Sequence, residues 1–252
     1  MRLVACILLL FITLGTHAQY DVPAKEMFDK LGHKAVYNGT YDGIVSYMLY
    51  TNPWSGYRYG EQVGPTLEGY IRLYETTQDK AYLIKFVNLA LKAVAWRKAN
   101  YRFNDLLYMD GQLLWPMAHF IHLVLIDDPN LATFEVSSNA GLIEVPASTI
   151  AVNELPFQSS YVFQEIATWL LARGVESLDA IIADEWDEDI GFKGAAAVNL
   201  QGGFAGALLH LGHMAAVNSS YSGLQSYLDR GARLAALFRS DMDIEDDCSC
   251  SS

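Results

Sequence analysis

The feature that most constrains this chain is a helical unit that recurs about every 46 residues. Apolar side chains recur at i, i+3, i+4 and i+7 in several segments, as they do on the buried face of an amphipathic helix. One helix of each unit is predicted to begin near Gly64, Gly111, Phe157 and Gly202. A repeat of this length indicates stacked pairs of helices, each pair burying its apolar face on its neighbours. The apolar stripes are Leu67, Tyr70, Ile71 and Tyr74; Leu83, Phe86, Val87, Ala90 and Val94; Leu114, Met117, Ala118, Ile121 and Leu125; Phe204, Ala207, Leu208, Leu211 and Ala215; and Leu224, Tyr227, Leu228, Ala235 and Phe238.

Histidines occupy equivalent positions in two of these units. The second and fourth units align at an offset of 91 residues, which matches His119 with His210 and His122 with His213. Residues three apart share a helix face, so two such pairs on facing helices could offer four imidazoles to zinc or another transition metal. Histidine on an apolar helix is more often a hydrogen-bonded core residue, and an H-E-x-x-H spacing is missing from the sequence. We therefore predict no metal and no cofactor.

The predicted class is all-α, and two architectures suit helical pairs of this length. One is an open solenoid and the other a closed α/α toroid. Glycine and alanine are frequent in the predicted inner helices, where small residues allow close approach around an axis, and this favours the toroid. The partner helix of the second unit would fall in 131–155, where the sequence resembles a loop. In an alternative phase, Ser159–Arg173 is an outer helix.

Composition excludes several functional classes. Hydrophobic residues make up 52% of the chain and charged residues 18%, so the chain can build a core. The formal charge of −12 and the lack of a basic stripe argue against DNA, RNA or anionic membranes as partners. After residue 20, no apolar run reaches the roughly 18 residues that a membrane span needs.

The N-terminus predicts export. Met1 and Arg2 precede an apolar run from Val4 to Leu14, and small residues stand before a cut after Ala18. We expect a signal peptide over residues 1–18, a helical domain over 19–240 and a polar tail over 241–252. The mature protein would then be secreted or periplasmic.

Two segments carry a family resemblance. The run from Leu73 to Leu83 resembles the LY-x-x-TGD-x-x-YL link between inner and outer helices of six-hairpin glycosidase-like proteins, and Trp186–Phe238 is similar to another such unit. The resemblance implies an α/α toroid, with unsaturated glucuronyl hydrolases or uronyl epimerases as possible relatives. A full toroid of this family has six hairpins, whereas residues 20–252 have room for about five. We therefore expect an incomplete ring.

The loops that enter the inner helices combine aromatic, carboxylate and carboxamide side chains. Aromatic rings stack on sugar faces, and polar side chains bind sugar hydroxyls. Glycoside cleavage needs two carboxyl groups, one of them protonated. We expect Asp110 as the acid, with Glu61 or Asp187 as its partner; a helix N-cap is the structural alternative for Asp110. The arginines could bind a uronate carboxylate. The predicted substrate-binding residues are Tyr57, Arg58, Tyr59, Arg102, Tyr108, Gln112, Trp115, Trp186, Asn199 and Gln201.

Two functions remain open on this basis. The first is a secreted hydrolase or lyase that acts on uronate-containing oligo- or polysaccharides by carboxylate acid–base catalysis. The second is a non-catalytic helical-repeat protein that binds glycan or protein on a concave face. The acidic and aromatic entry loops favour the enzyme, and the incomplete count of hairpins favours the binding protein.

Overall fold

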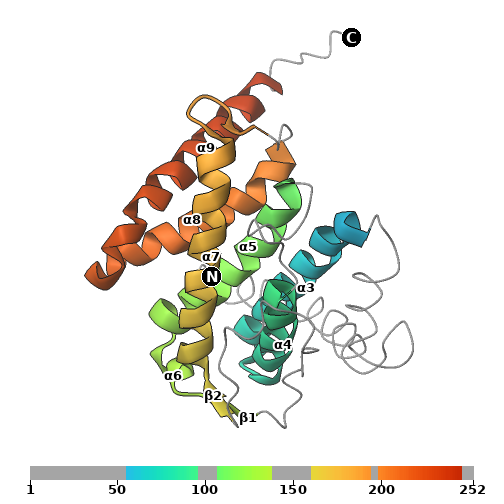
Figure 1. Cartoon of the computed structure of the whole chain (residues 1–252), viewed down its shortest axis with the longest axis vertical. Coiled ribbons are helices and arrows are strands. Elements are labelled where there is room, and N and C mark those ends of the chain that lie inside the picture. Colours follow the sequence, from blue (N-terminus) through green and yellow to red (C-terminus); the bar gives the residue numbers. More distant parts are fainter. Residues whose placement is uncertain (1–54, 96–106, 138–159, 194–197, 246–252) are drawn as a thin grey trace, which may run out of the picture. The chain divides into compact units, whose positions relative to one another are not determined.

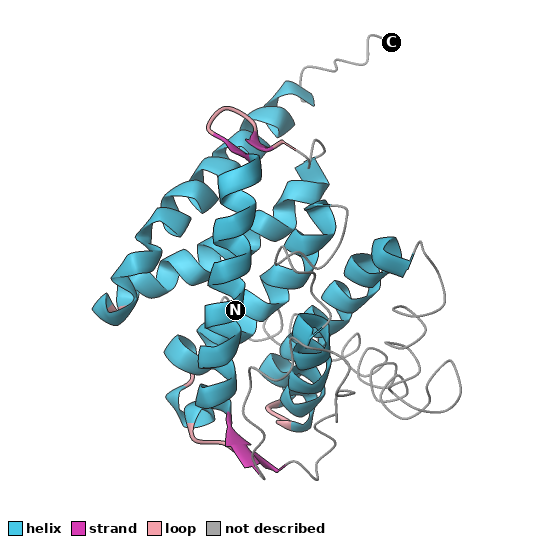
Figure 2. Cartoon of the chain, in the orientation of Figure 1, coloured by secondary structure: helices cyan, strands magenta, loops and turns pink. Residues whose placement is uncertain are grey.

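The computed structural model describes residues 55–95, 107–137, 160–193 and 198–245. The chain divides into two compact units, Met1–Tyr47 and Met48–Ser252, and all described residues belong to the second unit. The described residues are predominantly helical, which confirms the all-α class (Figure 2). The predicted signal peptide (1–18) lies outside the described residues, as does the end of the predicted tail (246–252); the first part of that tail belongs to a helix.

Three helices form a parallel row through this unit: α3 (Ser55–Thr77), α5 (Leu107–His122) and α8 (Val198–Val217) (Figure 1). Gly64, ten residues into α3, lies against Gln112 near the start of α5. Gly111 lies against Phe204 in the same way at the start of α8, and matching contacts recur at the other ends of the helices. The parallel direction is the one expected for equivalent helices of successive repeats.

An antiparallel helix accompanies each member of this row. Helix α4 (Ala81–Ala95) follows α3 after a short turn, α7 (Phe163–Glu185) packs on α5, and α9 (Gln225–Glu245) packs on α8. In the first turn Gln78 has a φ of 59°, at the position of the glycine in the LY-x-x-TGD pattern. Asp79 accepts a hydrogen bond from the backbone N of Ala81 over 3.0 Å, so it caps the start of α4.

The connection from α5 to α7 differs from the expected repeat. It runs through the π-helix η1 (Leu123–Asp127), α6 (Pro129–Ala132) and an antiparallel pair of strands, β1 (Glu135–Ser137) and β2 (Ser160–Val162). Because α5 and α8 contact each other directly, the inner helix predicted near Phe157 does not lie between them. The alternative phase, with an outer helix after Ser159, is the one observed.

The described residues therefore contain three helix pairs, α3–α4, α5–α7 and α8–α9, against about five expected over residues 20–252. The two remaining described elements on the α8 side are the short hairpin of β3 (Trp186–Asp187) and β4 (Gly191–Phe192) and the 3₁₀ helix η4 (Ser219–Leu224). Within the described part of the chain, no helix has both the length and the apolarity that a bilayer crossing requires.

The apolar stripes predicted for α3, α4, α5 and α8 form most of the core. An aromatic series joins α4, α5 and α7: the rings of Phe86 and Phe120 stack at 4.6 Å between centroids, and Phe120 meets Phe163 edge to face at 5.7 Å. In α9 the buried positions are Tyr227 and Leu234, whereas Ala235 of the predicted stripe is exposed.

Two helix starts lie earlier than the sequence suggests. The segment expected to be a loop before the first inner helix is already helical from Ser55, so Pro65 stands inside α3 rather than in its first turn. Pro116 likewise stands inside α5. Since proline has no N–H, the Gln112 carbonyl loses its usual helical partner. That carbonyl faces Gly64, where a side chain would collide with it.

The glycine contact between α5 and α8 generates a prediction. A Cβ placed on Gly203 would lie 2.6 Å from the Gly111 carbonyl oxygen and 2.7 Å from the Gln112 nitrogen, whereas a Cβ on the neighbouring Gly202 meets nothing within 4 Å. We expect Gly203→Ala to lower the free energy of unfolding by about 1–3 kcal/mol, because backbone atoms must move apart.

The matched control is Gly202→Ala, which should leave stability unchanged or raise it by up to about 1 kcal/mol, since alanine is the better helix former. Urea denaturation followed by circular dichroism measures both. Equal effects of the two substitutions would contradict the close packing of α5 on α8.

Candidate functional site

Polar and titratable side chains gather where the C-terminal halves of α3, α5 and α8 meet. Their common feature is a carboxylate or imidazole that faces another member of the group. We call them the histidine–carboxylate cluster: Glu68, Glu75, His119, His122, Asp127, His210 and His213.

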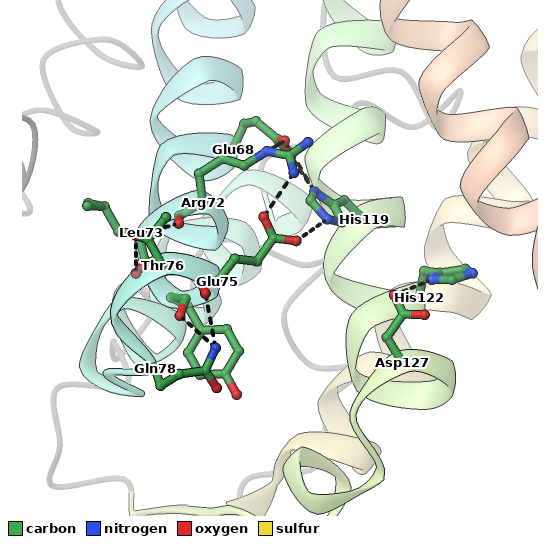
Figure 3. A network of polar contacts seen from close by, with 10 residues as sticks. Glu68, Arg72, Leu73, Glu75, Thr76, Gln78, His119, His122 and Asp127 are labelled. Atoms are coloured by element: carbon green, nitrogen blue, oxygen red, sulfur yellow. Dashed lines mark hydrogen bonds and ion pairs between the residues drawn. The ribbon is translucent and has the colours of Figure 1, made fainter. Parts of the chain in front are cut away.

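His119 of α5 lies between two carboxylates of α3. Its Nδ1 is 3.1 Å from Oε2 of Glu68, and its Nε2 is 3.2 Å from Oε1 of Glu75 (Figure 3). Ionised carboxylates only accept hydrogen bonds, so both contacts are hydrogen bonds at once when His119 carries a proton on each nitrogen. Glu68 and His119 are buried, while the side chain of Glu75 is 34% exposed.

Arg72 joins the same two carboxylates from within α3. Its Nε lies 2.8 Å from Oε1 of Glu68, and its Nη1 lies 2.9 Å from Oε2 of Glu75. Burial raises the pKa of Glu68, but the hydrogen bond to His119 and the positive charges of His119 and Arg72 outweigh it. The net effect lowers the pKa of Glu68 below its ordinary value. Glu68 is therefore ionised at neutral pH.

His210 of α8 stacks on His119. The ring centroids are 4.6 Å apart with an angle of 15° between the planes, and His122 meets His210 edge to face at 5.7 Å. Burial, and then the charges on His119 and His122, lower the pKa of His210 to about 4. At neutral pH His210 is thus an uncharged ring between two other imidazoles.

His122 forms the second hydrogen-bonded set. Its Nδ1 is 2.8 Å from Oδ2 of Asp127, and its Nε2 is 2.8 Å from Nδ1 of His213 on α8. Asp127 is five residues further along the chain, at the end of the π-helix η1, whose i→i+5 geometry is seen in the bond from the Asp128 N–H to the Leu123 carbonyl. A π-turn is often found at functional sites, and here it brings an acid under the His122 ring.

The cluster consists of side chains that can donate and accept protons. Its imidazoles stack on one another and bond to carboxylates, and among the described residues no group of three or more histidine, cysteine, aspartate or glutamate side chains is placed to hold a metal ion. Histidines and carboxylates are the side chains that most often serve as general acids and bases. Glu75 and His213 connect the buried centre of the cluster with solvent.

The predicted acid, Asp110, occupies a different place. It stands in the first turn of α5, and its side chain is 0% exposed. Its position is separated from His119 by nine residues, or roughly 14 Å along the helix axis. Gln112 and Trp115 lie on the same part of α5. The Oε1 of Gln112 is buried without a hydrogen-bond partner among the described residues, and Trp115 is half-buried against Gly206.

Gln201 holds the β3–β4 hairpin. Its Oε1 accepts a hydrogen bond from the backbone N of Phe192 over 3.1 Å, and its Nε2 donates to the carbonyl of Ile190 over 2.9 Å. Both polar atoms of this side chain therefore have backbone partners. This contact stabilises the hairpin and is a structural role that the sequence interpretation did not include.

Trp186 and Asp187 lie on that hairpin. The Nε1 of Trp186 donates to Glu188 over 2.8 Å, and its ring packs edge to face on Phe192. Asp187 accepts from the backbone N of Asp189 over 2.9 Å, which closes the turn. Both side chains are half-buried.

The remaining predicted site residues are outside the described side chains. Arg102 lies outside the described residues altogether. The others belong to helices whose backbone is described but whose side chains are not: Tyr57, Arg58, Tyr59 and Glu61 in α3, Tyr108 in α5 and Asn199 in α8. Their assignment stays a prediction, as does that of Asp110 and Asp187 as catalytic carboxylates.

Sequence reasoning identified both histidine pairs but missed their partners. Glu68 directly follows Leu67 of the predicted apolar stripe, and Glu75 is two helical turns further along α3. An acid beside a buried stripe, repeated after seven residues, is the pattern that could have found them. Asp127 left no such pattern, because its place under His122 depends on the π-turn.

Comparison with protein-family models, with curated proteins and with solved structures finds no match to this chain. The functional argument therefore depends on the geometry of the cluster and on the sequence.

The half-buried, uncharged His210 predicts a pH dependence of stability. The pKa of His210 is about 4 in the folded chain and 6.5 ordinarily, so between these values the unfolded chain binds more protons. Above pH 6.5 the uncharged His210 makes its full contribution to the free energy of unfolding, and this contribution is lost as the pH falls towards 4. After a discount for partial exposure it amounts to roughly 2 kcal/mol.

The test compares wild type with His210→Phe, which keeps a flat ring on His119 but cannot titrate. The free energy of unfolding is measured in urea at several pH values from 7 to 4. We expect the wild type to lose about 2 kcal/mol more than His210→Phe over this range. Parallel pH profiles would refute the assignment of an uncharged, buried His210.

Proposed function

We propose that this protein is a secreted helical-repeat enzyme that acts on carbohydrate by acid–base chemistry, as a hydrolase or lyase. The observation that carries the proposal is the contact of His119 with Glu68 and Glu75, beside the hydrogen-bonded His122 and His213. Imidazoles and carboxylates in hydrogen-bond contact are side chains that acid–base catalysis uses. The choice of uronate-containing glycans as substrates comes from the sequence resemblance and from the acidic and aromatic entry loops.

Glu75 is the group through which the His119 set reaches substrate in this proposal. Its side chain is 34% exposed, it contacts His119, and Arg72 holds its second oxygen. A carboxylate held by two cations has its position fixed, and a fixed position is what a general acid or base needs at the reacting atoms. Glu68 is buried and contacts Nδ1, the other nitrogen of His119, so it orients the His119 ring.

A second candidate is a non-catalytic protein that binds glycan or protein. The observation in its favour is that two residues expected in the entry-loop site have structural surroundings: Asp110 is fully buried, and Gln201 is bonded to the hairpin backbone. Under this candidate the histidine–carboxylate cluster would be a polar joint between repeats.

The chain offers a matched pair of variants for the enzyme proposal. Glu75 and Glu176 each follow an arginine by three residues and pair with it, at 2.9 Å for Arg72 and 3.3 Å for Arg173, and both are about one-third exposed. Glu75 also contacts an imidazole. We expect Glu75→Gln to lower turnover by about 100-fold or more and Glu176→Gln to leave it unchanged.

The assay screens plant, algal and animal glycans for new reducing ends and for the ultraviolet absorbance of unsaturated uronates, with thermal-shift measurements in parallel. Product that is lost in Glu75→Gln supports the enzyme and the cluster. Product that is lost only in Asp110→Asn would place catalysis at the start of α5 instead. Melting shifts without product would support the binding protein, and neither product nor shift with any glycan would contradict carbohydrate as the ligand in both candidates.

A further inference from the structure

Asp127, His122 and His213 form a hydrogen-bonded series, and the residue at each end of the series is exposed to solvent. His213 is exposed on α8, His122 is buried on α5 with 7% of its side chain accessible, and Asp127 at the end of η1 is 52% exposed. The contacts of His122 with Asp127 and with His213 are both 2.8 Å long. A buried ring with a short contact on each nitrogen has a fixed orientation, so the position of each proton follows from its partners.

The partners define the tautomers. Ionised Asp127 can only accept, so Nδ1 of His122 carries a proton. If His122 is uncharged, its Nε2 has a lone pair and accepts the proton on Nδ1 of His213. The Nε2 of His213 is then an unprotonated nitrogen. The other possible arrangement needs a cationic His122 that donates to His213 as well.

Two further imidazoles belong to the group around His122. His119 donates to two carboxylates and is cationic when both contacts are made. His210 contacts both rings, and its stack on His119 brings the three imidazoles into one group.

We propose that His213 is the proton acceptor of this site and that His122 and Asp127 are positioning residues that hold its Nε2 lone pair towards solvent. When Nε2 of His213 takes a proton, the Nδ1 proton of His213 can pass to Nε2 of His122, and the Nδ1 proton of His122 to Asp127. One proton enters the series at His213 and one arrives on the Asp127 carboxylate, so charge and atoms balance. The assignment rests on the proposed function for its substrate but not for its proton positions.

The test is a ¹⁵N–¹H correlation spectrum of the imidazole rings in the full-length protein at neutral pH. His213→Gln and His122→Gln assign the signals. We expect His122 and His213 each to be a single tautomer with the proton on Nδ1, and both Nδ1 protons to exchange slowly enough with water to be observed.

The variant Asp127→Asn removes the obligate acceptor, and its neighbour provides the control. Asp128 accepts a hydrogen bond from the hydroxyl of Tyr74 over 2.9 Å and caps α6, but it takes no part in the hydrogen-bonded series of Asp127, His122 and His213. We expect Asp127→Asn to convert both rings from one tautomer to a mixture with the Nε2–H form, and Asp128→Asn to leave both tautomers unchanged. Melting curves show that each variant is folded.

The outcomes separate this inference from the proposed function. A His213 ring with its proton on Nε2, or a doubly protonated His122 in the wild type, would overturn the proton acceptor even if glycan is cleaved. The expected tautomers in a protein that cleaves no glycan would keep the proton chain and refute the substrate. If the tautomers of His122 and His213 do not respond to Asp127→Asn, Asp127 does not set their proton positions.

Discussion

The direct contact between α5 and α8 is the constraint on which the site depends. Gly111 faces Gly203, and Gly206 lies under the Trp115 ring, so the two backbones approach closely at the start of the helices. Parallel helices that begin in register stay in register, since each advances by the same rise per residue. Positions 91 apart in the sequence therefore meet again further along, and they bring His122 against His213.

This packing places a polar centre inside an apolar interface. An apolar interface of equal size would be more stable than this one, because it would contain neither the half-buried imidazole of His210 nor the buried carboxylate of Glu68. The fold offsets the cost with complete pairing of His119, whose two nitrogens both face carboxylates. Protein sites that break the rules of core packing in this way are often functional ones.

The sequence predicts the helices well because their apolar periodicity is a local property. The stripes of α3, α4, α5 and α8 are buried as expected, and the offset of 91 residues correctly matched the histidine pairs. The described residues contain three helix pairs, and the number expected over residues 20–252, about five, stays a prediction. Phe157 precedes a helix that packs outside α5, and sequence spacing alone does not tell an inner helix from an outer one. A long connection between α5 and α7 also replaces the short turn that the other pairs use.

The candidate site was predicted only in part for a different reason. Both H-x-x-H pairs are visible in the sequence, but hydrogen-bond partners depend on tertiary contacts between helices. Asp110 fits a helix start as well as a catalytic acid by sequence; the structure shows that it is buried in the first turn of α5, and its catalytic role stays a prediction. Gln201 was expected to bind substrate, yet its amide matches two backbone groups of a hairpin ten residues earlier, a match that no spacing rule reveals.

The most direct test of the account is a crystal structure of the full chain at neutral pH in which the rings of His122 and His213 are resolved. The account predicts Nε2 of His122 within hydrogen-bond distance of Nδ1 of His213, with Asp127 on the opposite nitrogen. A structure in which α8 is shifted by one helical turn, so that His119 rather than His122 faces His213, would contradict it.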